Sequence, residues 1–200
     1  MQFRTDSAAG PVRQLTWIAM VLSLIGLSVP AGAQNALAGR HGRLFPPENL
    51  GLLEGPDRAA WQKPDQIMDA LGIADGAIVA DLGAGGGWFT IRLARRVGPN
   101  GVVYAEDIQP QMIEVIGDRV RREGLTNVRT VLGTPDDPRL PQPVDAALIV
   151  DAYHEMEDPV TMLRNVTLKP TGRIGVVGYL PGGGGPGPAP EDRPDPEAVI

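Results

Sequence analysis

The sequence predicts an α/β fold in which a doubly wound sheet of parallel strands carries helices on both faces. Short apolar segments alternate with longer segments whose apolar residues repeat at helical spacing, and this alternation is typical of that class. Residues 146–150 are apolar throughout, as expected of a strand buried on both faces. About five strands are expected, over residues 78–80, 101–106, 128–132, 146–150 and 173–180.

Helices are expected before and between these strands. Their predicted ranges are 57–71, 88–97, 110–123 and 158–166. Pro110 suits the first turn of a helix, where the missing backbone N–H leaves no hydrogen bond unmade. Gly72, Gly98 and Gly124 follow the first three helices as stop signals.

The 200 residues suit a single domain, preceded by a predicted export signal over residues 1–33. The apolar run Leu15–Val29 is followed by the small residues Ala31-Gly32-Ala33. Cleavage is therefore expected after Ala33, giving a periplasmic or secreted protein without stable membrane insertion. An uncleaved N-terminal membrane anchor is the alternative. Residues 34–56 are predicted to form an arm over a domain that spans residues 57–180.

Composition excludes several classes of chemistry. The chain has no cysteine, which rules out thiolate catalysis and cysteine metal ligands. Its net charge of −6 at pH 7, without a basic run, disfavours nucleic acid as a partner. Its histidines, His41 and His154, lie far apart, and a single His–Glu pair does not make a metal site. We expect a small-molecule substrate and no metal.

The most informative motif runs from Asp81 to Gly87. It reads D-x-G-x-G-x-G, directly after an apolar strand and directly before a helix. Gly83, Gly85 and Gly87 allow a tight turn and a close approach of the backbone to a ligand. A nicotinamide fingerprint would read G-x-G-x-x-G instead. A nicotinamide-dependent oxidoreductase, and a glycine turn that binds nothing, are the alternatives.

This motif resembles the first motif of the class I S-adenosylmethionine-dependent methyltransferases, and the resemblance covers about residues 57–180. It implies a Rossmann-like sheet, S-adenosyl-L-methionine as the cofactor, and a role for Asp81 in organising the aminoacyl end of that cofactor. The glycines would flank the same end. Because that fold has seven strands, we expect that a last helix and two strands are missing beyond the Gly/Pro-rich residues 181–200. A natural flexible tail is the alternative.

A second acidic site follows the second strand. Asp107-Ile108-Gln109-Pro110 matches the family pattern, which implies that Asp107 binds the ribose hydroxyls and that Ile108 packs on the adenine. Glu106 is one place out of step along the strand, so its side chain is expected to point elsewhere. Asp107 could instead cap the following helix, and the two roles can be combined.

The segment after the third strand departs from the family pattern. Thr134 stands where an acid is common, and Pro135 has no N–H to donate to the adenine. Asp136 is therefore our candidate for the adenine contact. The alternative is a solvated turn, for which Pro and Asp are ordinary residues.

The fourth candidate site, residues 151–155, lies just beyond the fourth strand, towards which the transferable methyl group points in the resembling fold. Asp151 is expected to close over the methionine end. Tyr153 and His154 are the candidate catalytic residues, because a histidine is a suitable base near neutral pH. Alternatively, these residues only shape the approach to the next helix.

The sequence as a whole predicts methyl transfer from S-adenosylmethionine to an unknown small-molecule acceptor. The enzyme would act mainly by positioning the acceptor for in-line attack. A non-catalytic protein that binds S-adenosylmethionine or a nucleoside is the first alternative, and an NAD(P)-dependent oxidoreductase is the second.

Overall fold

The computed structural model describes residues 44–182, 188–190, 193 and 195, together with the backbone of residues 2–4 and 17–19. The two N-terminal strands, β1 (Gln2–Arg4) and β2 (Trp17–Ala19), pair in an antiparallel sheet. Most of the predicted export signal and of the predicted tail lies outside the described residues. In the part of the chain that is described, no helix combines the length and the apolar character needed to cross a bilayer.

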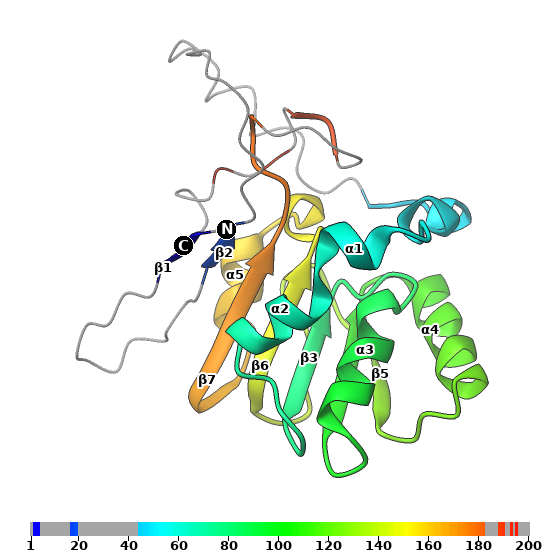
Figure 1. The fold of residues 1–200 in the computed structure, drawn as a ribbon. Coiled ribbons are helices and arrows are strands. Elements are labelled where there is room, and N and C mark those ends of the chain that lie inside the picture. Colours follow the sequence, from blue (N-terminus) through cyan, green and yellow to red (C-terminus); the bar gives the residue numbers. More distant parts are fainter. Residues whose placement is uncertain are drawn as a thin grey trace.

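The main sheet has five parallel strands in the order β5-β4-β3-β6-β7. The chain builds outward from β3 through β4 to β5, then crosses back to β6 on the other side of β3 (Figure 1). This reversal opens a crevice at the carboxyl ends of the strands, the usual ligand site of open α/β sheets. The strands are β3 (Ile78–Leu82), β4 (Val102–Asp107), β5 (Val128–Leu132), β6 (Val144–Val150) and β7 (Leu168–Val177).

Helices cover both faces of this sheet. The α-helices are α1 (Arg58–Gln62), α2 (Pro64–Ala70), α3 (Trp88–Val97), α4 (Pro110–Arg122) and α5 (Pro159–Asn165), and short 3₁₀ helices form at η2 (Pro47–Leu53) and η3 (Tyr153–Glu155). α2, α3 and α4 pack on one face, and α5 packs on the other (Figure 1). The predicted doubly wound α/β architecture is thus confirmed.

Two apolar cores follow from the alternation of side chains along each strand. Val79 and Leu148 point into the core shared with α2 and α3. Their neighbours Ala80 and Ile149 point into the core shared with α5. Since successive strand residues face opposite sides of a sheet, central strands must be apolar at nearly every position. The continuous apolar run at residues 146–150 is explained by this burial.

Most predicted elements agree with the structure to within one or two residues, and two of them differ more. The single helix expected over residues 57–71 is broken at Lys63, which has a left-handed φ of 50°. Lys63 precedes Pro64, and a proline disfavours the α conformation in the residue before it. Strand β7 begins at Leu168 and ends at Val177, whereas residues 173–180 were expected. Its pairing jumps from Val144–Leu168 to Ala146–Arg173, so the intervening residues form an irregularity within the strand.

Candidate active site at the carboxyl ends of the strands

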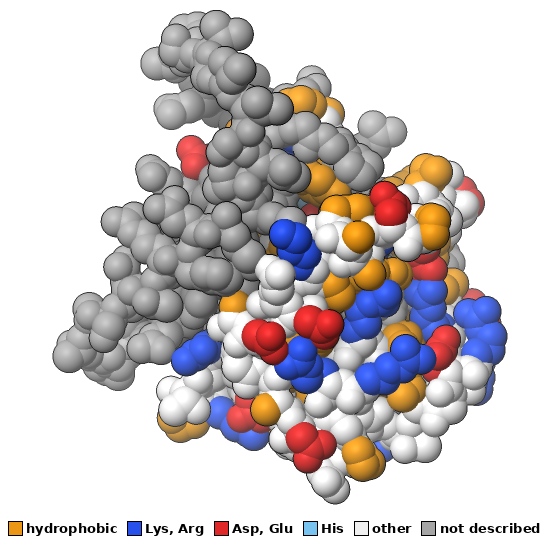
Figure 2. All heavy atoms as spheres, in the orientation of Figure 1, with side chains coloured by type: hydrophobic (Ala, Val, Ile, Leu, Met, Phe, Trp, Pro, Cys, Tyr) orange, Lys and Arg blue, Asp and Glu red, His pale blue; other side chains and the backbone are white. Residues whose placement is uncertain are grey.

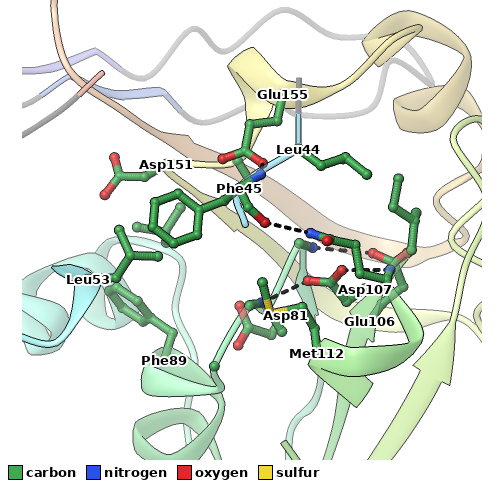
Figure 3. Close-up of a pocket in the computed structure, with 18 of the residues that line it drawn as sticks. Leu44, Phe45, Leu53, Asp81, Phe89, Glu106, Asp107, Met112, Asp151 and Glu155 are labelled. Carbon is green, nitrogen blue, oxygen red and sulfur yellow. Dashed lines mark hydrogen bonds between the residues drawn. The ribbon is translucent and has the colours of Figure 1, made fainter. Parts of the chain in front are cut away.

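A cavity of about 230 Å³ lies at the crevice between β3, β4 and β6. The glycine loop after β3 and the ends of β4 and β6 form its floor, and residues 44–54 cover it (Figure 3). Asp81, Gly83, Gly85, Asp107 and Asp151 all line it. These predicted site residues come from three different strand ends, which the parallel sheet brings to one edge.

The glycine loop depends on backbone conformations that favour glycine. Gly83, Gly85 and Gly87 have φ values of 66°, 53° and 78°, in the left-handed region. A methyl group on Gly83 would lie 2.5 Å from the Cβ of Ala152, so the loop packs directly against the chain after β6. Gly87 caps helix α3 and faces Ile116, and it is not part of the cavity lining.

Asp81 lies at the base of the glycine loop and is 2% exposed. Its Oδ2 accepts a hydrogen bond of 2.6 Å from the Oγ1 of Thr90 in α3. Burial raises the pKa of Asp81 to about 6, against the opposing effects of Thr90 and of the Arg58 charge. A bound cation would favour the charged form of this carboxyl group.

Asp107 ties the end of β4 to the glycine loop. Its Oδ2 accepts from the backbone N–H of Gly85 at 2.9 Å, and its Oδ1 accepts from the N–H of Gln109 at 2.9 Å. Gln109 is the N-cap residue of α4, and no side chain caps the helix, so Asp107 is not the helix N-cap given as its alternative role. Ile108 beside it lines the cavity. Burial raises the pKa of Asp107, and the two N–H groups oppose this shift.

The expectation that Glu106 points away from the site was wrong. Glu106 is 1% exposed, lines the cavity and accepts from the N–H of Gly83 at 3.3 Å through Oε2. Its Oε1 is buried and has no hydrogen-bond partner among the residues that the structure describes. Burial raises the pKa of Glu106 to about 8, so the carboxyl group holds its proton at neutral pH. Because strand β4 ends here, residues on both of its faces reach the same crevice.

The structure does not place Asp136 in the cavity. Asp136 is exposed, and its Oδ1 accepts a 2.8 Å hydrogen bond from the Oγ1 of Thr134. Thr134 also receives a bond from the N–H of Asp137 at 3.1 Å, so these polar groups satisfy one another within a turn. The neighbour that does line the cavity is Pro135. This is the solvated-turn alternative, and the adenine contact of Asp136 stays a prediction.

The segment after β6 presents Asp151 and Glu155 to the cavity, and not the two residues predicted to be catalytic. Tyr153 is 7% exposed and packs in the core shared with α5. His154 is not among the lining residues, and its Nε2 lies 3.8 Å from the Oε1 of Glu155. Since η3 is a tight 3₁₀ turn, its successive side chains point in different directions, and Glu155 is the one that faces the cavity.

Glu155 also closes the cavity from above. Its Oε2 accepts a hydrogen bond of 2.8 Å from the N–H of Phe45, and the carbonyl of Phe45 accepts from the Nε2 of Gln109 at 3.1 Å (Figure 3). Burial raises the pKa of Glu155 to about 7, with Asp107 and Asp151 contributing in the same direction. Glu155, which follows β6, therefore both faces the cavity and has a pKa near neutrality.

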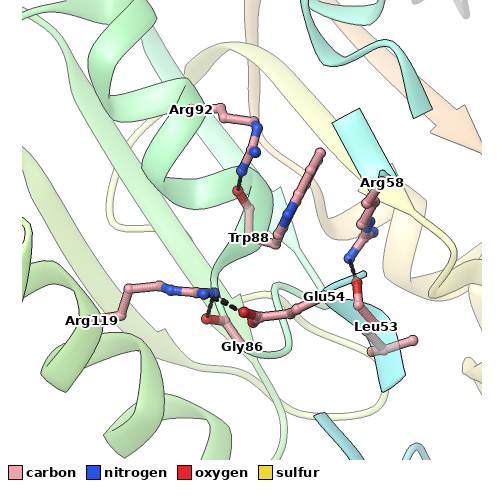
Figure 4. Close-up of polar contacts among 7 residues, drawn as sticks. All are labelled: Leu53, Glu54, Arg58, Gly86, Trp88, Arg92 and Arg119. Carbon is pink, nitrogen blue, oxygen red and sulfur yellow. Dashed lines mark hydrogen bonds and ion pairs between the residues drawn. The ribbon is translucent and has the colours of Figure 1, made fainter. Parts of the chain in front are cut away.

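Sequence reasoning missed the contribution of residues 44–58. Phe45, Leu50 and Arg58 line the cavity, yet nothing in the local pattern marks them as functional. Glu54 forms an ion pair with Arg119 of α4, and Arg119 also donates to the carbonyl of Gly86 at 2.6 Å (Figure 4). The segment is thus fastened to the glycine loop itself.

The cavity is strongly acidic. Seven of the residues that line it are Asp or Glu, and Arg58 is the one Lys or Arg among the described lining residues. Within the described ranges, no group of three or more His, Cys, Asp or Glu side chains is arranged to hold a metal ion. Glu106 is protonated at neutral pH and Glu54 is paired with Arg119, and the remaining acids favour a ligand that carries positive charge.

The outer face of α3 and α4 carries many basic side chains, with acidic side chains between them (Figure 2). Arg95 pairs with Glu123, and Arg96 pairs with Asp69, each at 2.6 Å. Each of these exposed pairs offsets one positive charge on this face. The absence of a nucleic-acid partner stays a prediction.

Comparison with known proteins supports a methyltransferase. A family model described as a methyltransferase domain matches residues 79–172. The chain is 30% identical over 121 residues to the nocamycin O-methyltransferase of Saccharothrix syringae, covering 58% of this chain and 42% of that protein. It is 33% identical over 118 residues to the ubiquinone/menaquinone biosynthesis C-methyltransferase UbiE of Pasteurella multocida, covering 56% and 43%. The chain spans less than half the length of these relatives.

The crystal structure of a SAM-dependent methyltransferase from Aquifex aeolicus superimposes with a TM-score of 0.68 and 26% identity, covering 76% of this chain and 82% of that one. The chain has the fold of S-adenosylmethionine-dependent methyltransferases. The expected Rossmann-like fold is confirmed, and the methyltransferase comparisons support S-adenosyl-L-methionine as the cofactor.

Proposed function

We propose that this chain binds S-adenosylmethionine in the acidic cavity and transfers its methyl group to a small-molecule acceptor. The main support for the proposal is that the glycine loop after β3 and the acidic motif at the end of β4 are hydrogen-bonded to each other in one site. Asp107, the predicted ribose ligand, holds the N–H of Gly85 in the glycine loop at 2.9 Å. Asp81 lies buried at the base of the same loop.

The residues present fit this cofactor. Asp107 and Ile108 at the end of β4 would hold the ribose and the adenine, and Asp81 and Asp151 would face the methionine end. One carboxyl oxygen of Asp151, a residue that lines the cavity, has no hydrogen-bond partner among the described residues, as expected where a ligand completes the hydrogen bonding. When bound, S-adenosylmethionine supplies an electrophilic methyl carbon.

The methyl acceptor would bind in the cavity next to Glu155. This carboxyl group is largely buried, faces the cavity, and has a pKa raised to about 7 by burial, so it can take up a proton from an acceptor that loses one as it attacks. His154, the base expected from the sequence, lies one residue away and outside the lining. Holding acceptor and cofactor in line is the larger contribution to rate.

Calorimetric titration with S-adenosylhomocysteine tests the proposal. We expect Asp107→Ala to weaken binding by about 1.5–3 kcal/mol, the range for lost charge-assisted hydrogen bonds. Glu106→Gln is the matched control, because a neutral amide resembles the protonated carboxyl group of Glu106, and wild-type affinity is expected. Tighter binding of NAD than of S-adenosylhomocysteine would favour an oxidoreductase instead. Cofactor binding without turnover across a broad panel of acceptors would favour the non-catalytic alternative.

A further inference from the structure

Glu155 and Glu157 mark the end of the cavity that lies next to the chain after β6. Glu155 ends η3, Glu157 follows it, and both line the cavity. Glu155 lies beside Leu44 and Phe45 of the covering segment, across the cavity from Asp81 (Figure 3). Glu157 is exposed, so it lies at the rim. Since the predicted cofactor contacts lie at the glycine loop and at the end of β4, this end of the cavity remains for a second ligand.

The walls around Glu155 are apolar. Leu44 and Phe45 come from the segment over the cavity, and Met156 and Met162 come from the chain after β6. Leu44 lines the cavity and is also 39% exposed, so apolar surface extends from the interior to the opening. Methionine side chains are flexible and adapt to ligands of different shape. A ligand bound at this end would therefore carry an apolar body.

The electrostatic potential at this end is negative. Asp107 and Asp151 lie close enough to Glu155 for their charges to raise the pKa of its carboxyl group, in addition to the larger effect of burial. Arg58, the one Lys or Arg among the described lining residues, is already engaged. Its Nη1 donates to the carbonyl of Leu53 at 2.7 Å, and its Nη2 lies 3.9 Å from the Oδ2 of Asp151. Among the described lining residues, no lysine or arginine is thus available to hold an anion beside Glu155.

The carboxyl group of Glu155 is held in place and can still bind a ligand. Its Oε2 accepts the hydrogen bond of 2.8 Å from the N–H of Phe45. Its Oε1 lies 3.8 Å from the Nε2 of His154, which does not line the cavity and so cannot contact a ligand bound there. A carboxylate has about four acceptor positions in all, so Glu155 can also accept a bond from an N–H or O–H group of a ligand.

These charges distinguish between the possible methyl acceptors. A phenol or an enol becomes an anion when it gives up its proton, and it would then lie beside the acidic groups of Glu155, Asp107 and Asp151. An amine arrives as a cation and becomes a neutral nucleophile when it gives up a proton. Like charges close together in a partly buried site repel strongly, whereas a cation is attracted there. The site is therefore suited to a nitrogen nucleophile.

We propose that the methyl acceptor is an amine with an apolar body, whose ammonium group binds to Glu155 and is attracted to the rim by Glu157. The proposal rests on the proposed function and adds the substrate class to it. The ammonium group gives one proton to the Glu155 carboxylate, and the lone pair left on nitrogen forms the new bond to the methyl carbon. The carbon–sulfur bond breaks, and its electron pair stays on sulfur. Glu155 then releases its proton to water, and the methylated amine leaves as an ammonium ion.

Four related probes test this charge preference in calorimetric titrations of protein saturated with S-adenosylhomocysteine. They are 2-phenylethylamine, 2-phenylethanol, 4-ethylphenol and 3-phenylpropanoate, which have similar apolar bodies and differ in charge and acidity. The amine should bind about 10- to 100-fold more tightly than the alcohol, the range for one charge-assisted hydrogen bond, and the carboxylate should bind least tightly. With S-adenosylmethionine in place of its product, mass spectrometry should show methylation of the amine and not of 4-ethylphenol.

Variants then assign the preference to residues. Glu155→Gln should remove the preference for the amine over the alcohol, while the glutamine oxygen can still accept from the N–H of Phe45 and the affinity for S-adenosylhomocysteine stays near the wild-type value. Glu157→Gln should weaken amine binding about two- to fivefold, and less at high salt, because exposed charges are screened. Glu48→Gln is the matched control: Glu48 is an exposed acid of the covering segment that does not line the cavity, so the preference should survive.

Several outcomes would overturn the proposal. Wild-type protein that binds the alcohol or 4-ethylphenol as tightly as the amine, or that methylates 4-ethylphenol in preference to the amine, would do so without any variant. Absence of amine binding to protein that does bind S-adenosylhomocysteine would have the same meaning. A Glu155→Gln variant that weakens all four probes equally would show that Glu155 shapes the cavity and does not select charge. If wild-type protein does not bind S-adenosylhomocysteine, the proposed function itself fails, which is a different result from loss of the amine preference.

Discussion

At the scale of single residues, the glycine loop leaves little freedom for substitution. Gly83 combines a φ of 66° with a close contact to Ala152, whereas Gly76 has a φ of 78° and no atom within 4 Å of an added Cβ. The two positions therefore separate backbone strain from steric exclusion. Only the first position touches the chain that follows β6.

We expect Gly83→Ala to lower the free energy of unfolding by about 2–4 kcal/mol, because strain and overpacking both apply. Binding of S-adenosylhomocysteine should be lost as the loop moves. Gly76→Ala should cost about 1 kcal/mol from strain alone and leave binding intact. Urea unfolding and ligand titration measure both quantities. Equal losses from the two substitutions would mean that the contact with Ala152 is unimportant.

The positions of the acidic residues were predicted only in part from the sequence. Asp81, Asp107 and Asp151 line the cavity as their positions after strands suggested. Glu106 lines the cavity against expectation, and Asp136 is not among the lining residues, because their surroundings decide their orientation. Glu106 bonds to the glycine loop, and Asp136 bonds within its own turn. Neither partner can be identified from the spacing of residues along the chain.

At the scale of elements, the segment 44–54 acts as a cover for the cavity. Its 3₁₀ helix η2 has no buried residues, so packing into the core does not hold it in place. The ion pair between Glu54 and Arg119 and the hydrogen bonds of Phe45 fasten it instead. A cover attached mainly by polar contacts can open at low cost, as ligand entry requires.

We expect Arg119→Ala to loosen this cover without disturbing the sheet. Arg119 is one-fifth exposed and bonds to both Glu54 and Gly86, so its loss should cost about 1 kcal/mol and raise amide exchange in residues 47–54 about fivefold. Hydrogen-exchange mass spectrometry gives this rate. The control is Arg121→Ala, whose exposed pair with Asp118 lies within α4. Unchanged exchange in the Arg119 variant would show that other contacts hold the cover.

At the scale of the whole molecule, the fold gathers acidic groups where water is excluded. Burial raises the pKa of Asp81 and Asp151 to about 6, of Glu155 to about 7 and of Glu106 to about 8. In the unfolded chain these groups ionise near pH 4. The folded protein therefore binds more protons than the unfolded chain between about pH 4 and pH 8.

The free energy of unfolding should accordingly fall as pH rises through this range. Each group contributes a slope of up to about 1.4 kcal/mol per pH unit while it is protonated in the folded state and ionised in the unfolded state. Between pH 7 and pH 8, Glu106 is the main group that is protonated in the folded protein and ionised in the unfolded chain. Glu106→Gln should flatten the slope there, as measured by urea unfolding at pH 6, 7 and 8. A slope identical to wild type would contradict the assignment of the proton to Glu106.

The sequence by itself determined the parallel α/β sheet, the positions of its strands to within a few residues, and the glycine loop with its leading aspartate. These features depend on local periodicity and on residue types that are close along the chain. Only the tertiary structure decided that Phe45 bonds to Glu155, 110 residues away, and that Arg58 lies beside Asp151. Such contacts arise when distant segments pack together, and the same packing removes the water that would keep the acids at their ordinary pKa values.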